Sequence, residues 1–238
     1  MFFFDPLYFL IMAPGLLLAA WAQYRVSSAF HAGSQYRSRG GISGAEAAAQ
    51  VLQAEGIDNV AIEPVPGELT DHYDPTHKVL RLSEPVYAGR TLAALGVAAH
   101  EAGHAIQDAH RYSALVVRNL VVPVASFGSS AAWIIFFVGL VMSSARMALG
   151  TPLMILGMAL FSGVVLFQLV NLPVEFDASR RARIALQMTG LVSPEEDVIV
   201  GRVLNAAALT YVAATLTAVL TLLYLLIRSG LLGSSRDE

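Results

Sequence analysis

Cysteine is absent from the 238-residue chain, which excludes disulfide bonds and thiolate chemistry. Histidine and carboxylate side chains are then the only strong ligands available for a transition-metal ion. Charged residues are also scarce, at 14% of the chain, against about 25% in average soluble domains. The net charge of −3 provides no basic field for a polyanion. We therefore expect no nucleic-acid partner.

Apolar residues, by contrast, are abundant and lie in long runs. They make up 55% of the chain, and the mean hydropathy is +0.59. A helix needs roughly 20 apolar residues to cross a bilayer, and four stretches approach or exceed that length: residues 2–22, 120–145, 152–172 and 206–227. The sequence thus predicts a multi-pass membrane protein with the lipid bilayer as a partner. The second stretch is interrupted at residues 126–130, although small residues also suit close helix packing in lipid.

The first apolar stretch has some features of a signal peptide, because Ala20-Trp21-Ala22 resembles a cleavage site. It carries Asp5 where a signal peptide has a positive region, and Arg25 follows it. We expect a retained membrane anchor.

Between the apolar stretches lies a polar insertion, residues 23–119 plus 173–205, within one integral membrane domain of residues 1–238. Ser43 and Glu46 form a capping-box pattern that opens an alanine-rich helix. Residues 60–65 alternate like a short strand that Pro64 and Pro66 stop, and residues 69–83 predict a β-hairpin around Asp74-Pro75. The hairpin edge could bind an extended peptide by strand addition or simply cover a helix, and we weigh these alternatives equally. The predicted fold is mainly α.

The most informative motif is His-Glu-x-x-His at residues 100–104, in an apolar helical run that Thr91 could cap. On a helix the two histidines share one face, roughly 6 Å apart, so both can reach one metal ion. Glu101 can then border the metal. Zn²⁺ lowers the pKa of a bound water to about 7, and a neighbouring carboxylate can take its proton. The alternative is a buried helix whose histidines only form hydrogen bonds.

Catalytic zinc usually has three protein ligands, and Glu175 is the best third candidate. It follows the third apolar stretch directly. The second and third stretches are joined by only a few residues, so they form a hairpin. Two crossings would return Glu175 to the membrane face that carries His100 and His104.

These segments resemble a known group of enzymes. His-Glu-x-x-His followed downstream by Glu-Phe-x-Ala resembles the membrane gluzincins of the HtpX and CAAX prenyl protease group. Residues 69–75, 81–83 and 171–179 are more similar to the YugP-like membrane zinc peptidases, over nearly the whole chain. The resemblance implies one catalytic zinc ion held by His100, His104 and Glu175, with Glu101 as general base.

The chain departs from the HtpX-like pattern at one position, where Ser179 replaces an aspartate four residues after the ligand glutamate. The chain therefore lacks the aspartate that would orient a ligand histidine in that pattern. The candidates to take over this role are Asp177, Ser179 and Asp108. A donor for the oxyanion of the transition state is also needed. Either His72 or Tyr211 could supply it, although a tyrosine at this depth is more often an interfacial anchor.

Basic residues are distributed unevenly. With four spans, twelve of the fifteen lysine and arginine residues lie on the zinc-bearing side. Positive residues favour the cytoplasm, so we expect a cytoplasmic active site and both termini outside. The cluster Arg180, Arg181 and Arg183 is interpreted as a topology signal that also meets anionic lipid headgroups.

The predicted function is a zinc metalloendopeptidase of a bacterial inner membrane that hydrolyses membrane-associated proteins or peptides. The alternative is a non-catalytic zinc-binding membrane scaffold, which would keep the three ligands but would not need Glu101. A transporter is disfavoured because the spans contain no charged pathway.

Overall fold

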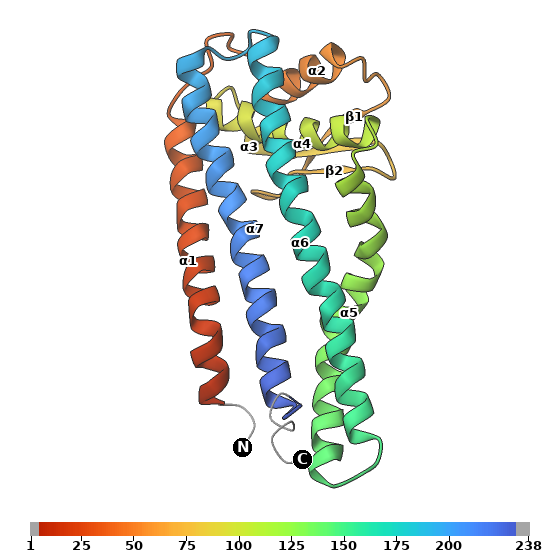
Figure 1. The fold of residues 1–238 in the computed structure, drawn as a ribbon. Helices are drawn as coiled ribbons and strands as arrows, with labels where there is room; N and C mark the ends of the chain where they lie inside the picture. Colours follow the sequence, from red (N-terminus) through yellow and green to blue (C-terminus); the bar gives the residue numbers. More distant parts are fainter. Residues whose placement is uncertain (1–4, 232–238) are drawn as a thin grey trace. The chain divides into compact units, whose positions relative to one another are not determined.

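The computed structural model describes residues 5–231. Four helices in this range are long and apolar enough to cross a membrane, as the sequence predicted: α1 (Pro6–Ser34), α5 (Ser113–Ser144), α6 (Gly150–Met188) and α7 (Pro194–Arg228). Each is longer than the apolar stretch it overlaps (Figure 1). Residues 2–4 of the first expected span lie outside the described residues.

Contacts divide the chain into two compact units. Unit 1 consists of Met1–Ala20, Val117–Leu172 and Tyr211–Glu238, and unit 2 consists of Trp21–Val116 and Pro173–Thr210. Unit 1 therefore holds most of the apolar residues of the four long helices. Unit 2 holds all the short helices and the strands.

Unit 1 is held together by aromatic packing and close backbone approaches. Tyr8 of α1 meets Tyr224 of α7 edge-to-face, with ring centroids 5.1 Å apart. A Cβ added at Gly139 of α5 would lie 2.5 Å from the backbone nitrogen of Met154 on α6. Helix α5 is continuous through residues 126–130, where Gly128 approaches α6 closely. The small residues that interrupt the apolar run therefore serve helix packing.

The short helices of unit 2 begin at the caps that the sequence predicted. The reciprocal hydrogen bonds of Ser43 and Glu46 open α2 (Gly44–Ala54). Thr91 accepts a hydrogen bond from the backbone of Ala94 and opens α4 (Leu92–Ala109). Another capping box, between Ser193 and Glu196, opens α7. These signals are local, so they can be recognised without knowledge of the tertiary structure.

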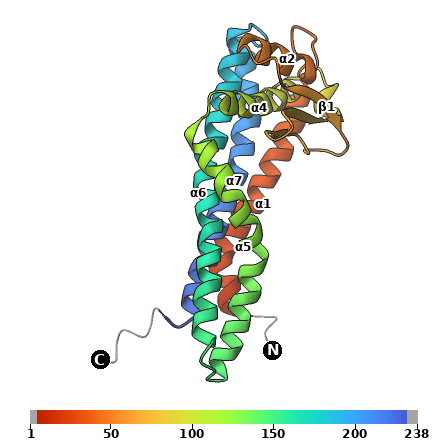
Figure 2. The ribbon, with the colours of Figure 1, turned by 90° about the vertical axis from the view of Figure 1, so that its right-hand side faces the viewer.

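A three-stranded sheet packs beside α4, with strand order β1-β3-β2 (Figure 2). The predicted hairpin is confirmed as β2 (His72–Asp74) antiparallel to β3 (Val79–Ser83), with Tyr73 opposite Leu80. Strand β1 (Ala61–Val65) pairs with β3 in parallel. The expectation that Pro64 would help end this strand is wrong, because β1 runs through it. A proline is tolerated there since β1 is an edge strand.

Helix α4 lies in the core of unit 2. Leu92, Leu95 and Ile106 are fully buried, and α2, the sheet and the short α3 (Glu84–Tyr87) all contact this helix. Small residues dominate its other faces, and they allow these neighbours to approach closely. A helix buried on nearly every side holds its side chains in defined positions, which suits a site that needs two of them aligned.

Candidate metal centre

The two histidines of the motif occupy adjacent turns of α4. Their ring centroids are 4.8 Å apart and the ring planes are nearly perpendicular, at 80°. His100 is 9% exposed, and His104 is only slightly more accessible. Since neighbouring elements enclose α4, these imidazoles face into the protein instead of into solvent.

Glu175 of α6 completes a triad with these histidines. Its Oε2 atom lies 3.3 Å from Nε2 of His100 and 3.5 Å from Nε2 of His104. One ligand atom from each of the three side chains lies within 4.8 Å of the others. Glu175 is 3% exposed. Residues more than 70 positions apart in the sequence are thus brought together.

Gly103 permits this meeting of α4 and α6. A Cβ built on Gly103 would lie 2.5 Å from the carbonyl oxygen of Ala178, a distance that real Cβ atoms do not adopt. Glycine is therefore required between the two histidines if α6 is to approach α4 this closely. The motif supplies both candidate histidine ligands and the space that lets Glu175 approach them.

The donor set fits a zinc ion. Oε2 of Glu175 is buried and accepts no hydrogen bond from any group in the described part of the chain. Leaving a buried carboxylate oxygen without a partner is costly, so such an atom is suited to coordinate a cation. Two imidazole nitrogens and one carboxylate oxygen form a common ligand set for catalytic zinc.

Glu101 is buried beside the triad, at 8% exposed. Burial raises its pKa, and the neighbouring His100 and His104 oppose this shift. Burial alone would lower the pKa of His104, but the negative charges of Glu175 and Glu101 and the contact with Gln107 raise it overall. The four side chains therefore form one electrostatically coupled group.

Gln107 fixes the orientation of His104. Its side-chain nitrogen donates hydrogen bonds to the Val174 carbonyl at 2.8 Å and to Asp177 at 3.0 Å. Both partners are acceptors, so the amide oxygen must be the atom that faces Nδ1 of His104, at 3.1 Å. That oxygen accepts the Nδ1 proton of the neutral ring. Nε2, which faces Glu175, then keeps its lone pair for a metal.

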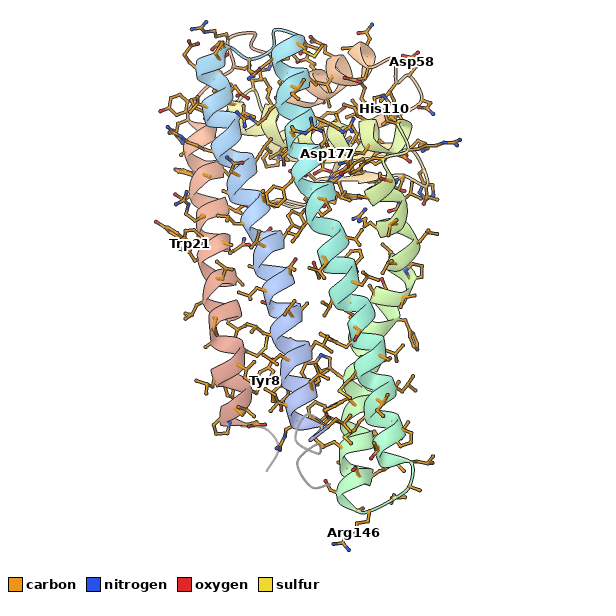
Figure 3. All side chains as sticks on the ribbon, viewed as in Figure 1. Tyr8, Trp21, Asp58, His110, Arg146 and Asp177 are labelled. Carbon is orange, nitrogen blue, oxygen red and sulfur yellow. The ribbon has the colours of Figure 1, made fainter. Side chains whose placement is uncertain are left out.

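His100 has a different partner, since its Nδ1 lies 3.1 Å from the hydroxyl of Ser179. Ser179 thus contacts a candidate ligand directly, whereas Asp177 reaches His104 only through Gln107. Asp177, labelled in Figure 3, also accepts hydrogen bonds from Arg180 and Arg181 on its own helix. The two histidines are oriented by separate groups.

The other candidates lie in different surroundings. Asp108 accepts a hydrogen bond from the hydroxyl of Tyr73 at 2.6 Å and one from Lys78. Burial and the bond to Asp108 raise the pKa of Tyr73. His72 is exposed and its ring bonds the carbonyl of Thr70. Tyr211 belongs to unit 1, so its role as an oxyanion donor stays a prediction.

Gln107 was not anticipated from the sequence. It lies three residues after His104 and seven after His100, so it shares their helical face. That position could have identified it as a neighbour of the ligands. Its partners, Val174 and Asp177, are about 70 residues away and could not be identified in this way.

Comparison with known proteins gives two results. Residues 8–230 match the family described as "Putative neutral zinc metallopeptidase". The chain is also 45% identical over 217 residues to "Putative membrane protease YugP" from Bacillus subtilis strain 168, covering 91% of this chain and 94% of that protein. No solved structure matches the chain significantly.

Proposed function

The chain belongs to the family described as "Putative neutral zinc metallopeptidase", and on this premise we propose that it is an integral membrane zinc metalloendopeptidase. His100, His104 and Glu175 would hold one catalytic zinc ion, and Glu101 would act as general base. The observation that carries the proposal is the buried Glu175 oxygen facing two imidazole nitrogens without a hydrogen-bond donor.

When bound, zinc supplies a Lewis acid that polarises the scissile carbonyl and lowers the pKa of a water molecule to about 7. Glu101 takes one proton from the water as its oxygen attacks the carbonyl carbon. The same carboxyl group then donates this proton to the departing amine as the C–N bond breaks. Gln107 keeps the Nε2 lone pair of His104 directed at the site, and Ser179 orients His100.

We further propose that the substrates are membrane-associated proteins or peptides. Glu175 follows the apolar part of α6 after only a few residues, so a bound chain would be held close to the bilayer. The distribution of basic residues supports a cytoplasmic site with both termini outside, in a bacterial inner membrane. The exposed edge of β2 offers main-chain groups for an extended substrate.

Replacement of Glu101 by glutamine tests the catalytic claim. The parent chain and Glu101→Gln would be purified in detergent, and zinc content and cleavage of casein and of membrane-anchored peptides would be measured on both. We expect equal zinc content and a loss of about 10²- to 10⁴-fold in cleavage rate for the variant. Asp58→Asn makes the same carboxylate-to-amide change on an exposed loop. This control should leave the zinc content and the cleavage rate unchanged.

Other outcomes would assign a different function. Equal cleavage by Glu101→Gln would remove Glu101 from the mechanism. If both proteins bind zinc and neither cleaves any substrate of a broad peptide library, the zinc-binding scaffold becomes the better account.

A further inference from the structure

The arginines of unit 2 fall into two groups. The three that follow Glu175 each have a carboxylate partner within the protein: Arg180 and Arg181 share Asp177, and Arg183 pairs with Asp197. The expectation that this cluster meets lipid headgroups stays a prediction, and most of its positive charge is offset within the protein. Arginines without a carboxylate partner are better candidates for binding an external anion.

Arg25 of α1 and Arg202 of α7 are two such residues. Within residues 5–231 no carboxylate lies within ion-pair distance of either guanidinium, and both side chains are exposed. Both line a pocket of about 590 Å³ between α1 and α7, within unit 2. Asn205 and Tyr36 add polar groups to the same pocket, and Leu209 is among its apolar residues.

The pocket lies where two helices change from apolar to polar sequence. On α1, Arg25 follows the apolar stretch that ends at residue 22. On α7, Arg202 precedes the apolar stretch that starts at residue 206. Trp21, 47% exposed, points away from α1 (Figure 3), and the Arg25 guanidinium lies 5.4 Å from its ring centroid. Exposed tryptophan and arginine at the end of an apolar stretch are typical of the membrane interface.

The chemistry of the pocket suits a phosphate ester with an apolar tail. Guanidinium groups bind phosphate through paired hydrogen bonds, and an amide or phenol can add another. The apolar residues could accommodate the first carbons of a lipid, and the volume is in the range of ligand pockets. We propose that this pocket binds the headgroup of an anionic phospholipid from the surrounding bilayer.

The test measures binding of phosphatidylglycerol to the delipidated full-length protein in detergent. Bound lipid would be counted by native mass spectrometry, with phosphatidylcholine as the zwitterionic comparison. We expect the parent to bind phosphatidylglycerol more tightly than phosphatidylcholine. Loss of each arginine, in Arg25→Gln or Arg202→Gln, should weaken this binding about fivefold, and loss of both about 25-fold.

The matched control is the double variant Arg111→Gln/Arg146→Gln. It removes the same charge from two exposed arginines outside the pocket and should bind phosphatidylglycerol like the parent. Zinc content and gel filtration would establish that each variant is folded, and the single variants remain informative if the double variant is not.

Three results would overturn the proposal. The first is equal affinity of the parent for the two lipids. The second is unchanged phosphatidylglycerol binding in both pocket variants. The third is binding of inorganic phosphate or of an acidic peptide that displaces phosphatidylglycerol at equal concentration, which would make the pocket a site for a soluble anion or a peptide.

Discussion

The two units satisfy their polar side chains in different ways. In unit 1, hydroxyls mostly bond carbonyls one turn back on their own helix, as Thr221 does to Thr217 and Ser162 to Met158, both at 2.8 Å. In unit 2, polar side chains join elements far apart in sequence, as Gln107 does with Asp177. A helix in lipid has to satisfy its polar groups locally, whereas unit 2 can build a network. A metal centre requires such a network, so we expect changes to the network around Glu175 in unit 2 to alter zinc binding and changes in unit 1 to alter stability alone.

The largest effect is expected for Glu175→Gln. The amide keeps the side-chain volume but removes the negative charge that zinc requires, so zinc content and proteolysis should both be lost. Zinc would be measured by mass spectrometry after dialysis. Glu68→Gln changes an exposed glutamate in the same way and is a control that should retain zinc content and proteolysis. A variant of Glu175 that keeps full zinc content would show that this residue is not a ligand.

A matched pair of glycine substitutions compares the units directly. Gly103→Ala in unit 2 and Gly139→Ala in unit 1 each place a Cβ 2.5 Å from backbone on a neighbouring helix. Each should lower the free energy of unfolding by about 1–3 kcal/mol. Only Gly103→Ala should also weaken zinc binding, because it separates α4 from α6 at the triad.

Thermal unfolding in detergent and zinc competition with a chelator would measure these two properties. If both variants lose zinc affinity equally, the site depends on global stability and the comparison fails.

Gln107→Leu is expected to have a smaller effect on zinc. The variant leaves Nδ1 of His104 without its acceptor, so the ring is no longer held in the ligand tautomer. Loss of such an orienting group typically costs 10- to 100-fold in metal affinity. Chelator competition would measure it, with Gln53→Leu on the exposed face of α2 as control. Unchanged affinity would mean that His104 is oriented without Gln107.

The smallest effect is expected on the exposed hairpin. Hydrogen bonds from Arg81 and His77 hold the pKa of Asp74 below its usual range. This contact therefore stabilises the fold above the unfolded pKa of about 3.9 and is lost as pH falls below it. Thermal melts of the parent and Asp74→Asn should differ slightly at pH 7, and the difference should shrink steadily as the pH falls below about 3.9 toward the lowered folded pKa. A difference that grows in acid would contradict this.

The features predicted correctly from sequence were those with local causes. The caps at Ser43 and Thr91 and the apolar lengths of four helices depend on neighbouring residues alone. The parallel pairing of β1 with β3 was missed, because register across a crossover depends on tertiary packing. Of the alternatives for orienting the ligand histidines, Ser179 contacts His100, Asp177 acts through Gln107, and Asp108 pairs with Tyr73 and Lys78. Sequence spacing could not separate these three.

Zinc X-ray absorption spectroscopy on the purified full-length protein tests the central claim most directly. The account predicts about one zinc ion per chain, with two imidazole nitrogens and a carboxylate oxygen at about 2.0–2.2 Å. The imidazole scattering should disappear together with the metal in Glu175→Gln. A protein that binds no zinc after expression with added zinc, or a spectrum without imidazole scattering, would contradict the account.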